Sequence, residues 1–209
     1  MYQIIPAILE TDWEKIEAKL NIIKPFSRNV HIDFLDGKFS QETSFMDFEP
    51  FKKHKDDFFM EAHLMVEDPS KYVKQLSEAG FKRFLGHVEK IEDLEEFVAE
   101  GQIFGEVGLA YDSSTMLDLE KIPFEDLDMV LLMGVKAGKS GQAFLPETLE
   151  KIKKIRSVTQ IPLEVDGGIN ENTIEKIKEV GATRFVVTSA IFNSYDPTQS
   201  FEKLLSLIS

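Results

Sequence analysis

The chain has 209 residues, 43% of them hydrophobic, and a formal net charge of −13. This suits one compact domain with a sizeable core, and the acidic balance argues against nucleic acid or an anionic membrane as a partner. The absence of cysteine excludes disulfides and thiolate metal sites. No apolar run approaches the roughly 20 residues of a membrane helix, and residues 1–6 lack the pattern of a signal peptide, so we expect a cytoplasmic protein.

Strand-like and helix-like segments alternate along the chain. Hydrophobic patterning predicts strands over 2–9, 29–35, 58–66, 83–88, 104–110, 128–133, 161–166 and 184–188. Helices are predicted over 12–23, 69–79, 91–100, 146–157, 171–180 and 199–208. Eight strands alternating with helices predict a single-domain (β/α)₈ TIM barrel over residues 1–209, with a doubly wound open sheet as the alternative.

Side chains that bind metals stand near the C-terminal ends of three predicted strands. His31 and Asp33 are two residues apart and therefore share one face of a strand, His63 lies late in the third strand, and Asp166 ends the seventh. Active sites of such barrels lie at these strand ends. Burying two imidazoles and two carboxylates there without a metal would be costly. The set therefore predicts one divalent metal ion, and its ligand chemistry suits Zn²⁺, Fe²⁺, Mn²⁺ or Co²⁺.

Each of these residues also has a purely structural interpretation. A histidine in a strand is more often a core residue than a ligand, and an Asp-Gly pair such as Asp166-Gly167 is typical of a turn. His87 ends the fourth predicted strand and could line the site, support a metal ligand from behind, or belong to the core. His54 lies in a run of lysines and aspartates and is predicted to be a solvated surface residue. The ligand interpretation therefore depends on the convergence of several strand ends.

Two groups of loop residues are candidates for binding a phosphate. The loop after the predicted sixth strand offers Gly138, Ser140, Gly141 and Gln142, and the loops after the last two strands offer Gly167, Gly168, Thr188 and Ser189. Barrels often hold phosphate at their last loops through backbone N–H groups. Ordinary turns would also account for these glycines. Lys136 and Lys139 could add positive charge in an otherwise acidic chain, or could be solvated.

At these positions the chain resembles the ribulose-phosphate 3-epimerase family. The resemblance runs from about Ile5 to Phe192 and rests on the order and spacing of short motifs. These motifs are Pro6-Ala7-Ile8-Leu9, His31-Ile32-Asp33 with Asp36-Gly37, His63-Leu64-Met65-Val66, His87-Val88-Glu89, the stretch from Met133 to Phe144, Glu164-Val165-Asp166-Gly167-Gly168 and Ser189-Ala190-Ile191-Phe192.

The resemblance implies that His31, Asp33, His63 and Asp166 are the metal ligands, and that Asp33 and Asp166 are also the catalytic acid/base groups. One aspartate would remove the proton beside the ketone, giving an enediolate, and the other would return a proton to the opposite face. The implied substrate is a phosphorylated ketose, with D-ribulose 5-phosphate to D-xylulose 5-phosphate as first choice, and the implied assembly is a homo-oligomer. Met65 would shield the metal site together with Met133, although core packing would also account for both.

Several positions depart from the family pattern. Ala7 stands where the family usually has serine, Leu35 replaces a methionine, and Thr188 replaces a glycine. Residues 38–42 and the loop 136–142 also differ. The acid/base and metal-binding residues are intact, while the loops expected to contact the substrate differ. The sequence therefore determines the type of reaction better than the identity of the substrate. Two alternatives therefore remain: an epimerase for a hexulose 6-phosphate, and a non-catalytic paralogue that binds a sugar phosphate or a metal. A barrel decarboxylase or aldol-type lyase is a third, but the predicted strand ends carry no Asp-x-Lys-x-x-Asp array and no lysine suited to a Schiff base.

Overall fold

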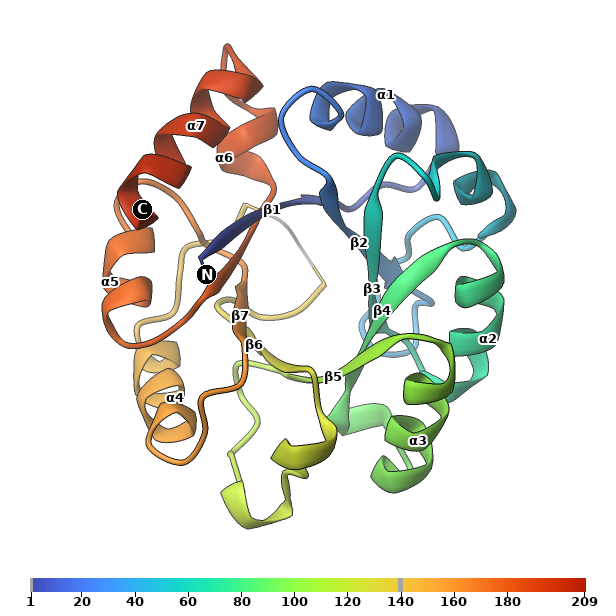
Figure 1. The fold of residues 1–209 in the computed structure, drawn as a ribbon, viewed down its shortest axis with the longest axis vertical. Helices are drawn as coiled ribbons and strands as arrows, with labels where there is room; N and C mark the ends of the chain where they lie inside the picture. The colour runs from blue at the N-terminus through green and yellow to red at the C-terminus, as the bar shows by residue number, and fades with distance from the viewer. Residues whose placement is uncertain (1, 139–140) are drawn as a thin grey trace.

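The computed structural model describes residues 2–138 and 141–209. Eight strands form a closed barrel in sequence order, surrounded by helices (Figure 1). The strands are β1 (Gln3–Ile8), β2 (Asn29–Leu35), β3 (Phe59–Met65), β4 (Phe81–His87), β5 (Glu106–Tyr111), β6 (Met129–Met133), β7 (Leu163–Asp166) and β8 (Arg184–Val187). Because β1 pairs in parallel with β8, the sheet closes on itself. The predicted (β/α)₈ barrel is confirmed, and the open sheet is excluded.

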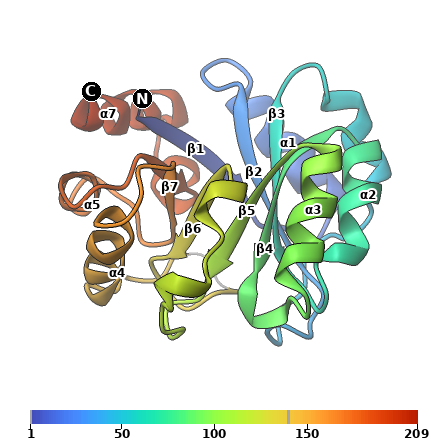
Figure 2. The same ribbon diagram turned by 60° about the horizontal axis from the view of Figure 1, so that its bottom comes forward.

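Helices cover the outside of the barrel, and in Figure 2 α2 and α3 lie side by side against it. The α-helices are α1 (Trp13–Ile23), α2 (Ser70–Glu78), α3 (Leu94–Phe104), α4 (Glu147–Arg156), α5 (Ile174–Glu179), α6 (Ser189–Phe192) and α7 (Pro197–Ile208). The 3₁₀ helix η1 (Glu49–His54) follows β2, and η3 (Leu119–Lys121) and η4 (Phe124–Asp126) follow β5, at the two places where no helix was predicted. Among the described residues, no helix has the length and apolar character needed to cross a membrane.

Helix α1 shows how the sequence fixes a helix against the barrel. The side chain of Asp12 accepts a hydrogen bond from the backbone N–H of Lys15 at 3.0 Å, which satisfies a free donor of the first turn. Ile16, Leu20 and Ile23 follow at helical spacing and are all buried. The helix therefore turns one apolar stripe to the core and leaves its other face in solvent.

Alternation along β2 separates the apolar core from the barrel interior. Ile32 and Phe34 belong to the large apolar cluster, which also includes buried residues of the helices. His31, Asp33 and Leu35 lie on the opposite face of the strand and are also buried, with Leu35 in a separate, smaller apolar cluster. The interior of the barrel therefore carries the polar residues that form the site.

The prediction that His54 is a solvated surface residue is wrong. His54 is 8% exposed, and its ring lies near those of Trp13 and Phe58, with centroid distances of 6.0 and 6.2 Å. The compact turn of η1 places this residue inward while the neighbouring Lys52 and Lys53 remain exposed. The charged residues around His54 therefore indicate only the solvent-facing side of the turn, and His54 lies on its other side.

Candidate metal centre and active site

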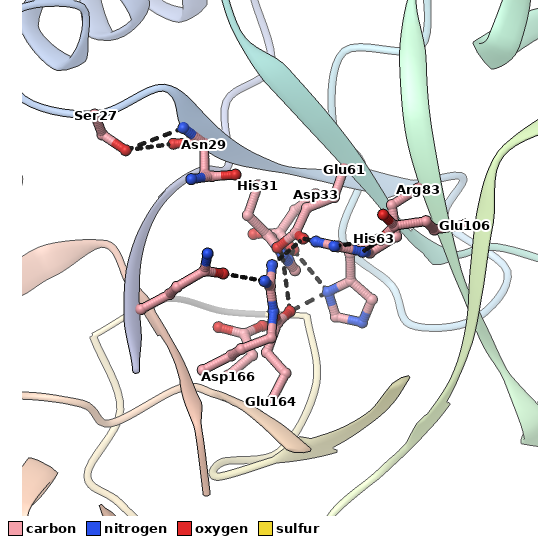
Figure 3. Close-up of polar contacts among 12 residues, drawn as sticks. Ser27, Asn29, His31, Asp33, Glu61, His63, Arg83, Glu106, Glu164 and Asp166 are labelled. Carbon is pink, nitrogen blue, oxygen red and sulfur yellow. Dashed lines mark hydrogen bonds and ion pairs between the residues drawn. The ribbon is translucent and has the colours of Figure 1, made fainter. Parts of the chain in front are cut away.

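Strand pairing brings four potential metal ligands together inside the barrel. His31 and Asp33 come from β2, the register between β2 and β3 pairs Asp33 with His63, and Asp166 is the last residue of β7. Each of the four offers one ligand atom, and these atoms all lie within 4.8 Å of one another (Figure 3). All four residues are buried. The four residues singled out as candidate ligands in the sequence thus form one cluster.

The donor atoms of this cluster fit a divalent metal ion. Oδ1 of Asp33 lies 3.3 Å from Nε2 of His31 and 2.9 Å from Nδ1 of His63, which is 3.6 Å from Oδ2 of Asp166. Nε2 of His31 is buried and has no hydrogen-bond partner among the described residues. A buried nitrogen left without a partner costs free energy, and a metal ion would supply that partner. Two imidazoles and two carboxylates without sulfur are ligands that suit a first-row divalent metal.

A buried network of two glutamates and two arginines supports His31 from the side of the barrel where the strands begin. Nδ1 of His31 lies 2.9 Å from Oε1 of Glu61, and Oε2 of Glu61 accepts hydrogen bonds from Arg83 and Arg184. Arg184 also donates to Glu164 at 2.7 Å. The arginines compensate the buried carboxylates, whose removal from water would otherwise be expensive. The hydrogen bond to Glu61 leaves Nε2 of His31 for the metal.

No role for this network was predicted from the sequence. Glu61 stands two residues before His63, and Glu164 stands two residues before Asp166. This is the same spacing that placed His31 and Asp33 on one face of their strand. The spacing on β3 and β7 would therefore have predicted that both glutamates face the barrel interior, one layer closer to the N-terminal ends of the strands than the ligands.

The environment separates the pKa values of the two aspartates. Burial and the negative charge of Asp33 raise the pKa of Asp166 to about 7. Burial also acts to raise the pKa of Asp33, but the neighbouring imidazoles of His31 and His63 outweigh it and lower that pKa well below its usual range. In the metal-free protein near neutral pH, the site therefore holds one carboxylate beside one carboxyl group that is partly protonated. Two carboxyl groups with separated pKa values are suited to act as base and acid.

The electrostatics of His31 couple metal binding to proton release. Burial acts to lower the pKa of His31, but the neighbouring carboxylates of Asp33, Glu164 and Glu61 raise it well above its ordinary value. This shift favours the protonated imidazole in the metal-free cluster. Since a ligating nitrogen must be deprotonated, a metal that binds here has to displace this proton.

Asp33 and Asp166 line a cavity at the mouth of the barrel. The predicted site residues that also line it are Met65, Met133, Gly138, Gly141, Gly167, Gly168, Thr188 and Ser189. Gln142 instead lines a neighbouring hollow, where its side chain donates to the carbonyl of Lys136 at 2.7 Å. His87 is fully buried behind His63, with the two Nε2 atoms 2.9 Å apart. Ser140 and Lys139 lie outside the described residues.

The cavity wall at Gly168 has no room for a side chain. Gly168 has a φ of +73°, and a Cβ there would lie 2.6 Å from the backbone N and Cα of Phe144. Gly141 has a similar φ of +79°, but no described heavy atom lies within 4 Å of its Cβ position. Gly168→Ala is expected to lower the free energy of unfolding by about 3 kcal/mol, because backbone strain adds to overpacking. Gly141→Ala, which carries the backbone strain alone, is expected to cost about 1 kcal/mol. Urea unfolding measures both, and equal losses would contradict the close packing at Gly168.

The family model described as the ribulose-phosphate 3 epimerase family matches residues 3–192. The chain belongs to this family. Among ribulose-phosphate 3-epimerases, the protein from Schizosaccharomyces pombe is 33% identical over 205 residues, covering 94% of this chain and 90% of that protein. The protein from Chlamydia muridarum is 31% identical over 214 residues, covering 98% of this chain and 93% of that protein. The resemblance seen in the sequence is therefore confirmed.

Membership of the ribulose-phosphate 3-epimerase family makes this chain an isomerase that acts on carbohydrates. The fold is shared more widely. The structure of 3-hexulose-6-phosphate synthase from Salmonella typhimurium superposes with a TM-score of 0.73 at 16% identity, covering 100% of this chain and 98% of that one. At this identity the likeness concerns the barrel alone, so the chemistry has to be argued from the site.

Proposed function

We propose that this chain is a metal-dependent epimerase that converts D-ribulose 5-phosphate to D-xylulose 5-phosphate by inverting the carbinol carbon next to the ketone. The observation that carries the proposal is the placement of Asp33 and Asp166, with separated pKa values, in one cavity and within one potential metal cluster. Relatives that cover nearly the whole chain are ribulose-phosphate 3-epimerases, which supports the choice of substrate.

We assign His31, Asp33, His63 and Asp166 as ligands of one divalent ion, which could be Zn²⁺, Fe²⁺, Mn²⁺ or Co²⁺. When bound, such an ion supplies Lewis-acid stabilisation, worth several kcal/mol, for negative charge on the oxygens of the substrate. The methionines Met65 and Met133 line the same cavity and would exclude water from that charge.

The two aspartates carry out the proton transfers. Asp33, in its carboxylate form, accepts the proton from the carbinol carbon, and the electron pair of the C–H bond passes into an enediolate. Asp166, in its protonated form, delivers a proton to the opposite face of the same carbon. The C–H bond is thereby remade with inverted configuration. In the reverse reaction the aspartates exchange roles, and each transfer contributes roughly a hundredfold or more to the rate.

The glycine-lined end of the cavity would hold the phosphate. Gly167 and Gly168 follow β7, Thr188 and Ser189 follow β8, and all four line the cavity. Since β7 and β8 are neighbouring strands, we expect their backbone N–H groups and hydroxyls to contact the phosphate together. From the loop after β6 we also propose Gly138 and Gly141, which line the cavity, and Ser140, which lies outside the described residues. The predicted contact at Gln142 is not proposed again, because this residue lines the neighbouring hollow. In a chain with a net charge of −13, N–H and O–H donors offer a way to bind phosphate without a basic patch.

Exchange of the carbinol proton with solvent deuterium, followed by NMR, tests the substrate and the reaction together. We expect exchange and inversion of D-ribulose 5-phosphate with at least one of the four metals, and a kcat/KM at least about a hundredfold lower for hexulose 6-phosphates, whose extra carbon must fit the same cavity. A preference for a hexulose 6-phosphate would favour that alternative. Absence of exchange with every ketose phosphate would establish the non-catalytic paralogue and contradict the proposal.

Ala7 is the departure from the family pattern that bears most directly on the choice of substrate. Ala7 is fully buried on β1 and pairs with His31 in the register between β1 and β2, so the hydroxyl of the usual serine is missing next to the metal cluster.

Assembly into a homo-oligomer and a cytoplasmic location stay predictions. Light scattering on the purified chain measures the first, and fractionation of cells measures the second.

A further inference from the structure

A line of hydrogen bonds leads from the metal-facing side of His63 to the rim of the barrel. His63 turns Nδ1 toward Asp33, and its Nε2 lies 2.9 Å from Nε2 of His87. Nδ1 of His87 lies 2.8 Å from Oε2 of Glu89, which follows β4 in the 3₁₀ helix η2 (Val88–Lys90). Both imidazoles are fully buried, whereas the side chain of Glu89 is 23% exposed. Neither Glu89 nor His87 has a role in the chemistry proposed above.

The direction of each hydrogen bond follows from the requirement at one end of the line. For His63 to ligate a metal through Nδ1, that nitrogen must carry a lone pair, so the ring proton must sit on Nε2. Nε2 of His63 then donates to Nε2 of His87, which must be an acceptor. The proton of His87 must therefore sit on Nδ1, where it needs an acceptor of its own. Glu89 supplies that acceptor.

Glu89 is itself fixed as an acceptor from the other side. Its Oε1 accepts a hydrogen bond from the backbone N–H of Asp112 at 2.8 Å and another from the hydroxyl of Thr115. Burial acts to raise the pKa of Glu89, but the hydrogen bonds from His87 and Thr115 outweigh it and contribute to lowering the pKa to about 2. The carboxylate therefore has one oxygen committed to the loop after β5 and the other committed to His87.

We propose that Glu89 and His87 are positioning residues that hold His63 in the tautomer whose Nδ1 faces the metal. The inference rests on the metal site of the proposed function and extends it by two residues. It also makes the two imidazole ligands alike: His31 is oriented by Glu61 directly, and His63 is oriented by Glu89 through a second imidazole. Outer partners of this kind fix ring orientation and raise the basicity of the ligand.

The substitution Glu89→Gln would exchange the donor and acceptor in each of these hydrogen bonds while nearly preserving the shape of the side chain. A glutamine side chain has one acceptor oxygen, and the backbone N–H of Asp112 cannot turn away from it. The amide NH₂ group is then left facing Nδ1 of His87 and must donate to it. His87 would carry its proton on Nε2 and donate to His63, which places the proton of His63 on Nδ1. Nδ1 of His63 could then bind a metal only after the hydrogen bonds that join residue 89, His87 and His63 are rearranged.

Metal affinity of the full chain tests the inference. Metal-free protein is titrated with Zn²⁺ in competition with a chromophoric chelator, and we expect Glu89→Gln to bind about 10- to 100-fold more weakly than the wild type. Glu89→Asp keeps a carboxylate and is expected to recover part of this loss. The matched control is Glu92→Gln, which makes the same chemical change at an exposed position three residues away and is expected to bind Zn²⁺ as the wild type does.

Nitrogen-15 NMR reads the tautomers independently of activity, and the chain has only four histidines to assign. In the zinc-loaded wild type we expect the proton of His87 on Nδ1, and in metal-free Glu89→Gln we expect it on Nε2. Wild-type affinity in Glu89→Gln, or a proton on Nε2 of His87 in the zinc-loaded wild type, would overturn the inference while leaving the proposed function intact. A wild-type chain that binds none of the four metals would instead overturn the proposed function, and this inference with it.

Discussion

Asp33→Asn and Asp166→Asn are each expected to lower kcat for epimerisation by about a thousandfold, since positioned proton transfer contributes roughly 10²- to 10⁴-fold. Asparagine nearly preserves the volume of aspartate and keeps one oxygen that can ligate a metal, but it cannot take up or release a proton in this reaction. Both residues are buried in the cluster, at 7% and 8% exposure, so solvent cannot easily replace the missing group. An NMR assay that follows both epimers measures the loss.

The two variants should also differ in a way that a simple loss of activity would not show. Each keeps one of the two carboxylates, so each should still exchange the carbinol proton of one epimer with solvent deuterium, without inversion. If the aspartates address opposite faces, Asp33→Asn and Asp166→Asn will label different epimers. Asp118→Asn, at an aspartate paired with Lys121 on the surface, is the control and should epimerise normally. Labelling of the same epimer by both variants would contradict a mechanism with two opposed acid/base groups.

The separation of pKa values explains why two chemically identical side chains can take these two roles. Asp33 lies beside the imidazoles of both histidines of the cluster, whereas Asp166 faces the charge of Asp33 in a buried position. The first environment favours the charged form and the second favours the neutral form. Both effects arise from where β2, β3 and β7 end in the barrel, and hence from the closure of the sheet.

The sequence was sufficient for the barrel and for the ligand cluster because both depend on short-range patterns. The strand predicted over 29–35 is observed as β2 (Asn29–Leu35), and the spacing of His31 and Asp33 placed them on one face. The rule that barrel sites lie at strand ends then added His63 and Asp166. The alternation of a strand and the direction of its neighbours were enough for that step, with no knowledge of exact register.

The supporting network was not predicted because it depends on register between strands that are distant in sequence. Arg184 reaches Glu61 across a separation of 123 residues, and only the closed barrel places β8 and β3 around one interior. The same limit explains the error at His54. Its local run of charges indicated solvent, whereas the ring that covers it, Trp13, belongs to a separate segment, the start of α1. Local composition cannot report a partner of this kind.

Removal of divalent metal with a chelator is expected to abolish epimerisation and to lower the melting temperature by roughly 10 °C compared with protein in a thousandfold excess of metal over its Kd. A ligand that binds only the folded state at this excess stabilises it by about 4 kcal/mol, and each kcal/mol shifts the melting temperature of a chain of this size by about 2–4 °C. Without the ion, Nε2 of His31 stays unpartnered and two buried carboxyl groups stay close together. Calorimetry with and without metal measures the shift.

Two histidine variants separate metal binding from a general loss of packing. His63→Ala removes a proposed ligand and should melt at the same temperature with and without added metal. His54→Ala removes a buried histidine near Trp13 and outside the cluster, so it should lower the melting temperature yet keep the full gain on adding metal. An equal gain in both variants would place the stabilising ion elsewhere on the chain, and full activity after chelation would contradict a metal-dependent reaction. The pair therefore decides whether the polar interior of this barrel is a metal centre or only a buried hydrogen-bond network.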